Sequence, residues 1–262
     1  NNNTVDGGDN NQAFFAEERG RTRISYVISQ ASIQEFQVNT SNYSAEYGRS
    51  AGGVVNAVTK SGSNQFHGGL FYYIRDNGLG TNNAFQTIRT PAGADVKIKP
   101  IDRRQQFGGN IGGPVFKDRL FFFFNYDQQM RNFPGVANPG SPGTFLADLS
   151  TTEVSTLTGT LNPPGVSSPG RGLTAAQAQA GLDFLRSITG VVPRKGSQQV
   201  YFPKVDWKVN SNHSVAVSYN AMRWDSPAGI QTQPVVARGI RSFGDDFVKV
   251  DSVIARVNSV LG

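Results

Sequence analysis

Residues 204–209 read KVDWKV, and this short stretch has the sharpest strand pattern in the chain. Apolar and charged side chains alternate along it: Val205, Trp207 and Val209 are interleaved with Lys204, Asp206 and Lys208. This period of two is typical of a β-strand, whose successive side chains point to opposite faces of a sheet. A soluble core rarely accepts a charge at every inward position, whereas a water-filled lumen does. The stretch therefore predicts a strand with hydrocarbon on one face and water on the other.

Five further stretches predict strands of the same kind. They are residues 66–75, 104–113, 120–127, 214–222 and 247–260. The clearest alternation sets Val215, Val217 and Tyr219 against Ser214, Ser218 and Asn220. In 120–127 only the upper half is cleanly two-faced, because residues 120–124 are apolar at both sets of positions. The alternation in 247–260 is poor, so the pattern leaves the register of that strand open.

The connectors between these strands alternate in length. The short ones, 114–119 and 210–213, are rich in turn-forming residues. The long ones cover 76–102, 132–198 and 225–246, and the second is far too long for an ordinary loop of a compact soluble domain. Transmembrane β-barrels have tight turns on one side of the membrane and long loops on the other. The chain is therefore predicted to be all-β, with about six antiparallel strands of an outer-membrane barrel.

The longest connector contains a predicted helix. Apolar residues recur at helical spacing within 173–188, and Gly190 and Pro193 follow as stop signals. We expect a short helix in an extracellular loop. One interpretation is a surface for a ligand or partner, and the other is an amphipathic helix that only covers the mouth of the barrel.

The composition excludes several other classes. The longest wholly apolar runs, such as 120–124, are far shorter than the roughly 20 residues of a membrane helix, so a helical membrane protein is excluded. The 30 glycines and 13 prolines among 262 residues favour a β-rich, loop-rich chain. With no cysteine, a disulfide framework and thiolate metal sites are excluded. The net charge of +6 comes from 25 basic residues scattered among 19 acidic ones, so no nucleic-acid partner is expected.

No set of residues predicts catalysis, a cofactor or a metal. His67 and His213 are the two histidines, and neither has a second ligand at a zinc-like interval. Asp6 and Asp9 have a spacing that would suit Ca²⁺, but no bidentate Glu follows at EF-hand distance, so a plain loop is favoured. A Ser, His and acid set or a poised carboxylate pair does not stand out. The chain is not expected to be an enzyme.

The first 65 residues lack sustained alternation and contain two of the four motifs by which the chain resembles a known family. The motifs are TVDGGDNNQAFF from Thr4, IQEFQV followed by YSAEYGRSAGGVVNAVTKSG within 33–62, and, later, GGNIGGPVFKDRLFFFFNY from Gly108 and PKVDWKVN from Pro203. Together and in this order they resemble the TonB-dependent outer-membrane receptors, particularly the Oar-like group. The segment 33–62 resembles the closing half of the plug domain of that family.

The resemblance implies a domain organisation and a mechanism. Residues 1–65 would be the C-terminal part of a plug, and 66–262 the N-terminal portion of a barrel of about 22 strands, a size whose lumen is plugged. Six strands cannot close such a barrel, and the start lacks a signal peptide, an energy-coupling box and the first half of a plug. We therefore expect an internal fragment of a receptor that binds a bulky extracellular ligand, a carbohydrate or peptide for example. The TonB complex would act through a segment absent from this chain, and membrane lipid would surround the barrel.

The resemblance also names candidate site residues in the plug. They are Glu35, Glu46, Tyr47, Gly48, Arg49, Gly52 and Gly53. The glycines permit tight turns and close packing against the barrel wall, although ordinary loop glycines would read the same way. The charged members would pair with the inner wall as a latch that force releases. The alternative is solvated charge near lumenal water, because exposed pairs contribute only about 0–1 kcal/mol. The ligand-binding residues stay unknown.

Two other function classes stay open. The first is a surface-displayed, β-rich binding or adhesion module that uses the long loops without transport. The second is a soluble β-protein such as a hydrolase, in which the aromatic residues would pack in a core. In a membrane barrel, aromatic girdles at the interfaces are expected, and Trp224 is the strongest candidate, followed by Tyr72, Tyr73, Trp207 and Tyr219.

Overall fold

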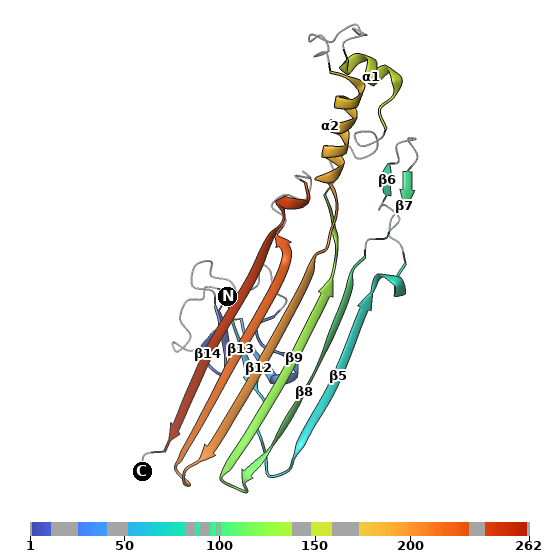
Figure 1. Ribbon diagram of the computed structural model, residues 1–262. Helices are drawn as coiled ribbons and strands as arrows, with labels where there is room; N and C mark the ends of the chain where they lie inside the picture. Colours follow the sequence, from blue (N-terminus) through green and yellow to red (C-terminus); the bar gives the residue numbers. More distant parts are fainter. Residues whose placement is uncertain are drawn as a thin grey trace.

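The computed structural model describes residues 2–11, 26–40, 52–81, 87–89, 95–97, 99, 101–137, 148–158, 173–230 and 239–260. Its largest element is a six-stranded antiparallel sheet, here called the long sheet (Figure 1). In spatial order its strands are β14 (Gly244–Ser259), β13 (His213–Ile230), β12 (Lys195–Lys208), β9 (Leu120–Asn132), β8 (Arg103–Phe116) and β5 (His67–Asp76). All six predicted strands are therefore confirmed.

The strands of the long sheet are longer than a membrane requires. A tilted transmembrane strand needs about 9–11 residues, whereas β8 has 14 and β13 has 18. The poorly alternating last strand nevertheless has alternating exposure along most of its length. Its apolar residues lie on both faces, because Val248 and Val250 pack inward while Phe247 and Val253 are exposed. Because apolar residues occur on both faces of this strand, its composition could not show its register.

The short connectors are tight turns, as the pattern predicts. Between β8 and β9, Asp118 adopts a left-handed conformation with φ of 63°. Its backbone N–H donates to Asn64 Oδ1 at 2.8 Å, which ties the turn to the segment that leads into β5. Between β12 and β13, Asn210 Oδ1 accepts from the backbone N–H groups of Asn212 and His213. Such Asx contacts are the usual chemistry of turns.

The long connectors lie at the opposite end of the long sheet (Figure 1). Strands β10 (Gly135–Ala137) and β11 (Gly190–Val192) extend the β9–β12 hairpin. Beyond them lie α1 (Thr151–Leu157) and α2 (Ala175–Ser187), and β6 (Thr87–Arg89) pairs with β7 (Asp95–Lys97) in the neighbouring loop. Short 3₁₀ turns occur at η2 (Asn77–Leu79) and η3 (Ile240–Ser242).

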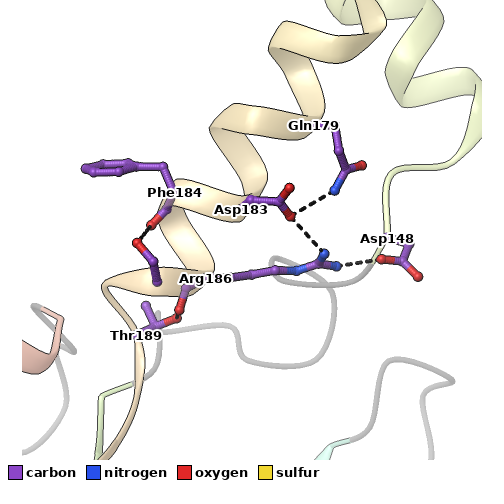
Figure 2. Close-up of polar contacts among 7 residues, drawn as sticks. Asp148, Gln179, Asp183, Phe184, Arg186 and Thr189 are labelled. Atoms are coloured by element: carbon purple, nitrogen blue, oxygen red, sulfur yellow. Dashed lines mark hydrogen bonds and ion pairs between the residues drawn. The ribbon is translucent and has the colours of Figure 1, made fainter.

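The predicted helix is confirmed as α2. Its position bears on whether the helix covers the mouth of the barrel or is free to form a binding surface. Figure 1 shows α2 projecting away from the strand ends instead of lying across the long sheet. At its last turn Arg186 pairs with Asp148 at 2.7 Å and with Asp183 at 3.5 Å, as Figure 2 shows. These contacts hold α2 to the preceding loop segment. Helix α1 was not predicted, although Ser150 and Glu153 form a capping box that the sequence displays.

A second, smaller sheet is built from the N-terminal part of the chain. Its order is β2 (Gly8–Asp9), β1 (Asn2–Val5), β4 (Val54–Thr59) and β3 (Ile33–Asn39), with β1 parallel to β4. This small sheet lies behind the middle of the long sheet in Figure 1. A short apolar cluster of Val27, Val200 and Met222 joins the segment before η1 (Gln30–Ser32) to the long sheet.

The strongest girdle candidate was wrong. Trp224 lies on the face of β13 that carries Met222, and it packs against the Val27 cluster. Tyr73 shares its face with Phe71, whose ring it stacks on at 5.6 Å, and with Arg75. Aromatic residues can lie on the face that meets lipid or on the face that packs against another segment of the chain. The sequence pattern does not distinguish the two faces. In the part of the chain that the structure describes, no helix is long and apolar enough to cross a membrane.

Candidate functional site

One face of the long sheet is polar and covered by the N-terminal residues. We call it the covered face. Its buried polar residues are Asn125, Asp127, Gln129, Gln198, Lys204, Ser218 and Asn220. The opposite or outer face exposes apolar side chains, among them Val205, Trp207, Val217, Val253 and Val257. The predicted two-sided strands are therefore confirmed, and the polar side is the one that meets the rest of the chain.

The first contact between the sheets is a buried ion pair. Lys204 Nζ lies 3.4 Å from Asp6 Oδ2, and the two side chains are only 4% and 8% exposed. The same ammonium group donates to Thr59 Oγ1 at 2.8 Å. Asp6 also accepts from the backbone N–H of Thr59 at 2.8 Å, so its carboxylate joins β1, β4 and β12. A buried charge needs this degree of compensation, because desolvation opposes its burial.

The second contact is a carboxylate that accepts from several donors. Asp127, which is buried on β9, accepts from Tyr26 Oη at 2.7 Å and from Ser29 Oγ at 2.6 Å. Gln106 Nε2 donates to the same carboxylate at 3.1 Å. Burial raises the pKa of the Tyr26 hydroxyl, and the hydrogen bond to Asp127 raises it further. Tyr26 therefore keeps its proton, and with it the donor that this contact requires.

Side-chain amides make the third set of contacts. Gln198 Nε2 donates to Tyr26 O at 2.5 Å, and Asn220 Nδ2 donates to Val27 O at 3.1 Å. Asn110 Nδ2 reaches Ala31 O at 3.4 Å. The three amides come from β12, β13 and β8, and all three bind backbone carbonyls. The segment 26–31 is therefore fixed to the covered face mainly through polar groups.

The link between β4 and β5 passes close to the long sheet at Gly62. A Cβ atom at this position would lie 2.3 Å from Phe122 O and 2.7 Å from Gly113 O. Such distances are far below van der Waals contact, so a larger residue would displace the link between β4 and β5 from β8 and β9. The sequence shows a glycine here, but only the tertiary structure shows why glycine is needed.

The predicted site residues are only partly described. Glu46, Tyr47, Gly48 and Arg49 lie outside the described residues. Glu35 is exposed on β3 and accepts from Gln37 Nε2 at 3.0 Å.

Two of the predicted glycines are described. Gly52 is exposed, whereas Gly53 is buried with φ of 153°, a conformation that L side chains rarely adopt. A Cβ atom on Gly53 would lie 3.2 Å from Asn39 O. A side chain at this position is therefore disfavoured both by the backbone conformation and by contact with the end of β3.

Sequence reasoning missed the residues that join the two sheets. It placed Lys204 correctly on an inward position, but it considered Asp6 only as a weak calcium ligand. In the structure Asp9 accepts from the backbone N–H of Asn11, and Asp6 turns to Lys204. Among the described residues, no group of three or more His, Asp or Glu side chains is placed to hold a metal ion. The available signal was Lys204, because a cation at an inward position of β12 requires a negatively charged partner.

An antiparallel sheet with one polar, covered face and one apolar, exposed face defines the wall of an outer-membrane β-barrel. Residues 58–258 match the family model described as "Outer membrane beta barrel domain", and the chain belongs to this family. It is a protein of the bacterial outer membrane.

The similar proteins agree with the predicted resemblance. The chain is 35% identical over 123 residues to the TonB-dependent transporter Oar of Myxococcus xanthus, a match that covers 47% of this chain and 11% of that protein. The fold resembles the outer membrane transporter YddB from Escherichia coli, with a TM-score of 0.55 and 11% identity over 99% of this chain and 29% of that one. It also resembles the siderophore receptor PirA from Acinetobacter baumannii, with a TM-score of 0.51 and 14% identity over 98% and 29%. The chain thus spans less than a third of each of these proteins.

Proposed function

We propose that this chain is part of a TonB-dependent receptor that carries a bulky ligand across the outer membrane with energy from the inner membrane. In this proposal the small sheet and residues 1–65 belong to a plug, and residues 66–262 belong to the barrel wall. The observation that carries the proposal is the polar junction of Lys204 with Asp6 and of Asp127 with Tyr26 and Ser29.

The chemistry of this junction suits a part that must move. Polar groups that separate can form hydrogen bonds to water instead, whereas separation of a large apolar interface exposes apolar surface to water with nothing in return. The apolar cluster at the junction is small, with three buried residues in the described part of the chain. A plug held mainly by polar groups can leave the wall under force and be rehydrated. Glu35, Glu46 and Arg49 remain candidates for further latch contacts.

A second function is favoured by one observation. Helix α2 projects beyond the strand ends and exposes Phe184, a large apolar side chain. An adhesion module would use such a loop to bind a partner without transport. The two functions differ in whether the small sheet has to leave the covered face.

A cysteine-labelling experiment in the full-length receptor separates the two functions. Ser32 is fully buried beside the covered face, and the chain has no cysteine of its own. With Ser32→Cys as the sole cysteine, we expect a membrane-impermeant maleimide to label energised cells of the native host and to label cells without TonB several-fold more slowly. Denatured protein gives the total thiol as control. Equal, slow labelling in both strains would exclude a moving plug and favour the adhesion module.

A further inference from the structure

Three arginines lie directly opposite one another on neighbouring strands of the long sheet. In the register of the sheet, Arg75 of β5 pairs with Arg104 of β8, and Arg104 pairs with Arg131 of β9. Residues that are directly opposite share a face. Gln106, two positions beyond Arg104, donates to Tyr26 and Asp127, so this is the covered face. We call Arg75, Arg104 and Arg131 the arginine row.

The arginine row lies above the polar junction, where the strands continue into the long connectors. Neighbouring strands are about 5 Å apart, so the row spans roughly 10 Å from Arg75 to Arg131. Arg75 is exposed, and Arg104 and Arg131 are partly exposed. The row is therefore accessible from the side of the sheet on which a ligand would enter.

The positive charge of the row is only partly compensated. Asp102 accepts from Arg131 Nε at 2.8 Å and from Arg131 Nη2 at 3.0 Å, and this bond lowers the pKa of Asp102. Within the described ranges, Arg75 and Arg104 form no ion pair of their own, and the Asp102 carboxylate acts on both only from a distance. The neighbouring acid Asp76 instead pairs with Arg103 at 3.5 Å on the outer face.

A fourth arginine adds to the positive potential. Arg194 and Arg131 both stack on the ring of Phe133, with guanidinium carbons 4.6 and 4.4 Å from its centroid. Burial lowers the pKa of Arg194, and the charge of Arg131 lowers it further. Like charges placed directly opposite each other on a sheet are destabilising. Repulsion among these arginines destabilises the free protein, and a bound anion would relieve it.

We propose that the arginine row binds a part of the transported ligand that carries two or more carboxylate or phosphate groups. A guanidinium group matches both oxyanions through paired N–H donors. The spacing of about 5 Å per strand fits successive anionic groups along one molecule. The inference rests on the proposed function only in placing the row on the route of a transported ligand, because binding itself needs no energy source.

The test uses the full-length receptor in detergent, with inorganic tripolyphosphate and citrate as probes at low salt. We expect wild type to bind at least one probe, and the probe that binds more tightly assigns phosphate or carboxylate as the group. Arg104→Gln should weaken binding at least tenfold, and the triple change of Arg75, Arg104 and Arg131 to Gln should abolish it. The matched control is Arg103→Gln, which removes the same charge one residue away on the outer face. Isothermal titration gives the affinities.

A stability measurement keeps the test valid if a variant folds less well. Without probe, Arg104→Gln should unfold at the same temperature as wild type or higher, because it removes like-charge repulsion. With probe, the unfolding temperature of wild type should rise, that of Arg104→Gln should rise much less, and that of the triple variant should not rise. Failure of wild type to bind either probe, or an equal loss in Arg103→Gln, would overturn the inference. The labelling of Ser32→Cys depends on TonB and not on these probes, so the two proposals can fail separately.

Discussion

The covered face of the long sheet carries two groups of basic residues that differ in how their charge is compensated. Lys204 is buried and has Asp6 and Thr59 as partners from the small sheet. The arginine row lies higher on the same face, is partly exposed, and has Asp102 as its one acidic partner among the described residues. Charge on an inward strand position therefore has two uses. One holds the N-terminal part in place, and the other leaves positive potential for a ligand.

The comparison is tested most strongly at Lys204. Lys204→Met removes the cation and leaves the Asp6 carboxylate buried, which typically costs about 3–5 kcal/mol. We expect the small sheet to separate from the covered face and Ser32→Cys to be labelled rapidly even without TonB. Lys208→Met is the control, since Lys208 lies on the same face of β12 but is exposed. Slow labelling in Lys204→Met would mean that the ion pair does not hold the two sheets together.

A positive charge introduced on the outer face tests the same comparison, which predicts that this face tolerates charge poorly. Val217 is exposed on the outer face of β13. Val217→Arg should cost about 2–4 kcal/mol if it lies near the middle of the bilayer. Folding can be followed by heat-modifiable migration of the full-length protein in gels. Asp225→Arg lies further along the outer face of the same strand, toward the long connectors, and should have a smaller effect. If both variants fold as well as wild type, the outer face does not meet lipid.

Asp127 tests whether the junction depends on charge as well as on shape. Asp127→Asn keeps the size of the side chain but removes the negative charge that Tyr26 and Ser29 donate to. Hydrogen bonds to a charged group contribute about 1.5–3 kcal/mol each. We expect faster labelling of Ser32→Cys than in wild type, but slower than in Lys204→Met. Asp225→Asn makes the same chemical change on the outer face and should leave labelling unchanged.

Arg186 shows how little an ion pair contributes in water. Its partner Asp148 is 92% exposed, and the pair lies at the end of α2, away from the covered face (Figure 2). Exposed pairs are screened and contribute little to global stability. Arg186→Gln should leave the unfolding temperature unchanged and speed only the hydrogen exchange of amides in the last turn of α2. A clear fall in unfolding temperature would mean that the loop is coupled to the barrel wall.

Much of the fold could be predicted because its signals are local. The period of two at 204–209 gave the correct strand and the correct inward face for Lys204. Turn residues at 114–119 and 210–213 marked the short end of the sheet. The helix in 173–188 was predicted from its spacing and stop signals, whereas the seven-residue α1 was missed because its apolar pattern is too short to show a period.

The candidate site could not be predicted in the same way. Trp224 was assigned to the lipid interface because it lies near a strand end. That position does not show which face of the strand the side chain is on. Asp6 and Lys204 are 198 residues apart, so no local pattern links them. Tyr26 and Ser29 lie in a stretch without alternation, and they become part of a site only because the fold brings them into contact with Asp127 on β9.

Local residue patterns specify which residues form strands and which side of each strand can tolerate water, because backbone geometry repeats every two residues. Whether an inward charge is compensated depends on how the folded chain packs. The energy of a charge depends on the groups within a few ångströms of it, and those groups come from distant parts of the chain. Lys204 meets a carboxylate, while Arg75 and Arg104 meet each other.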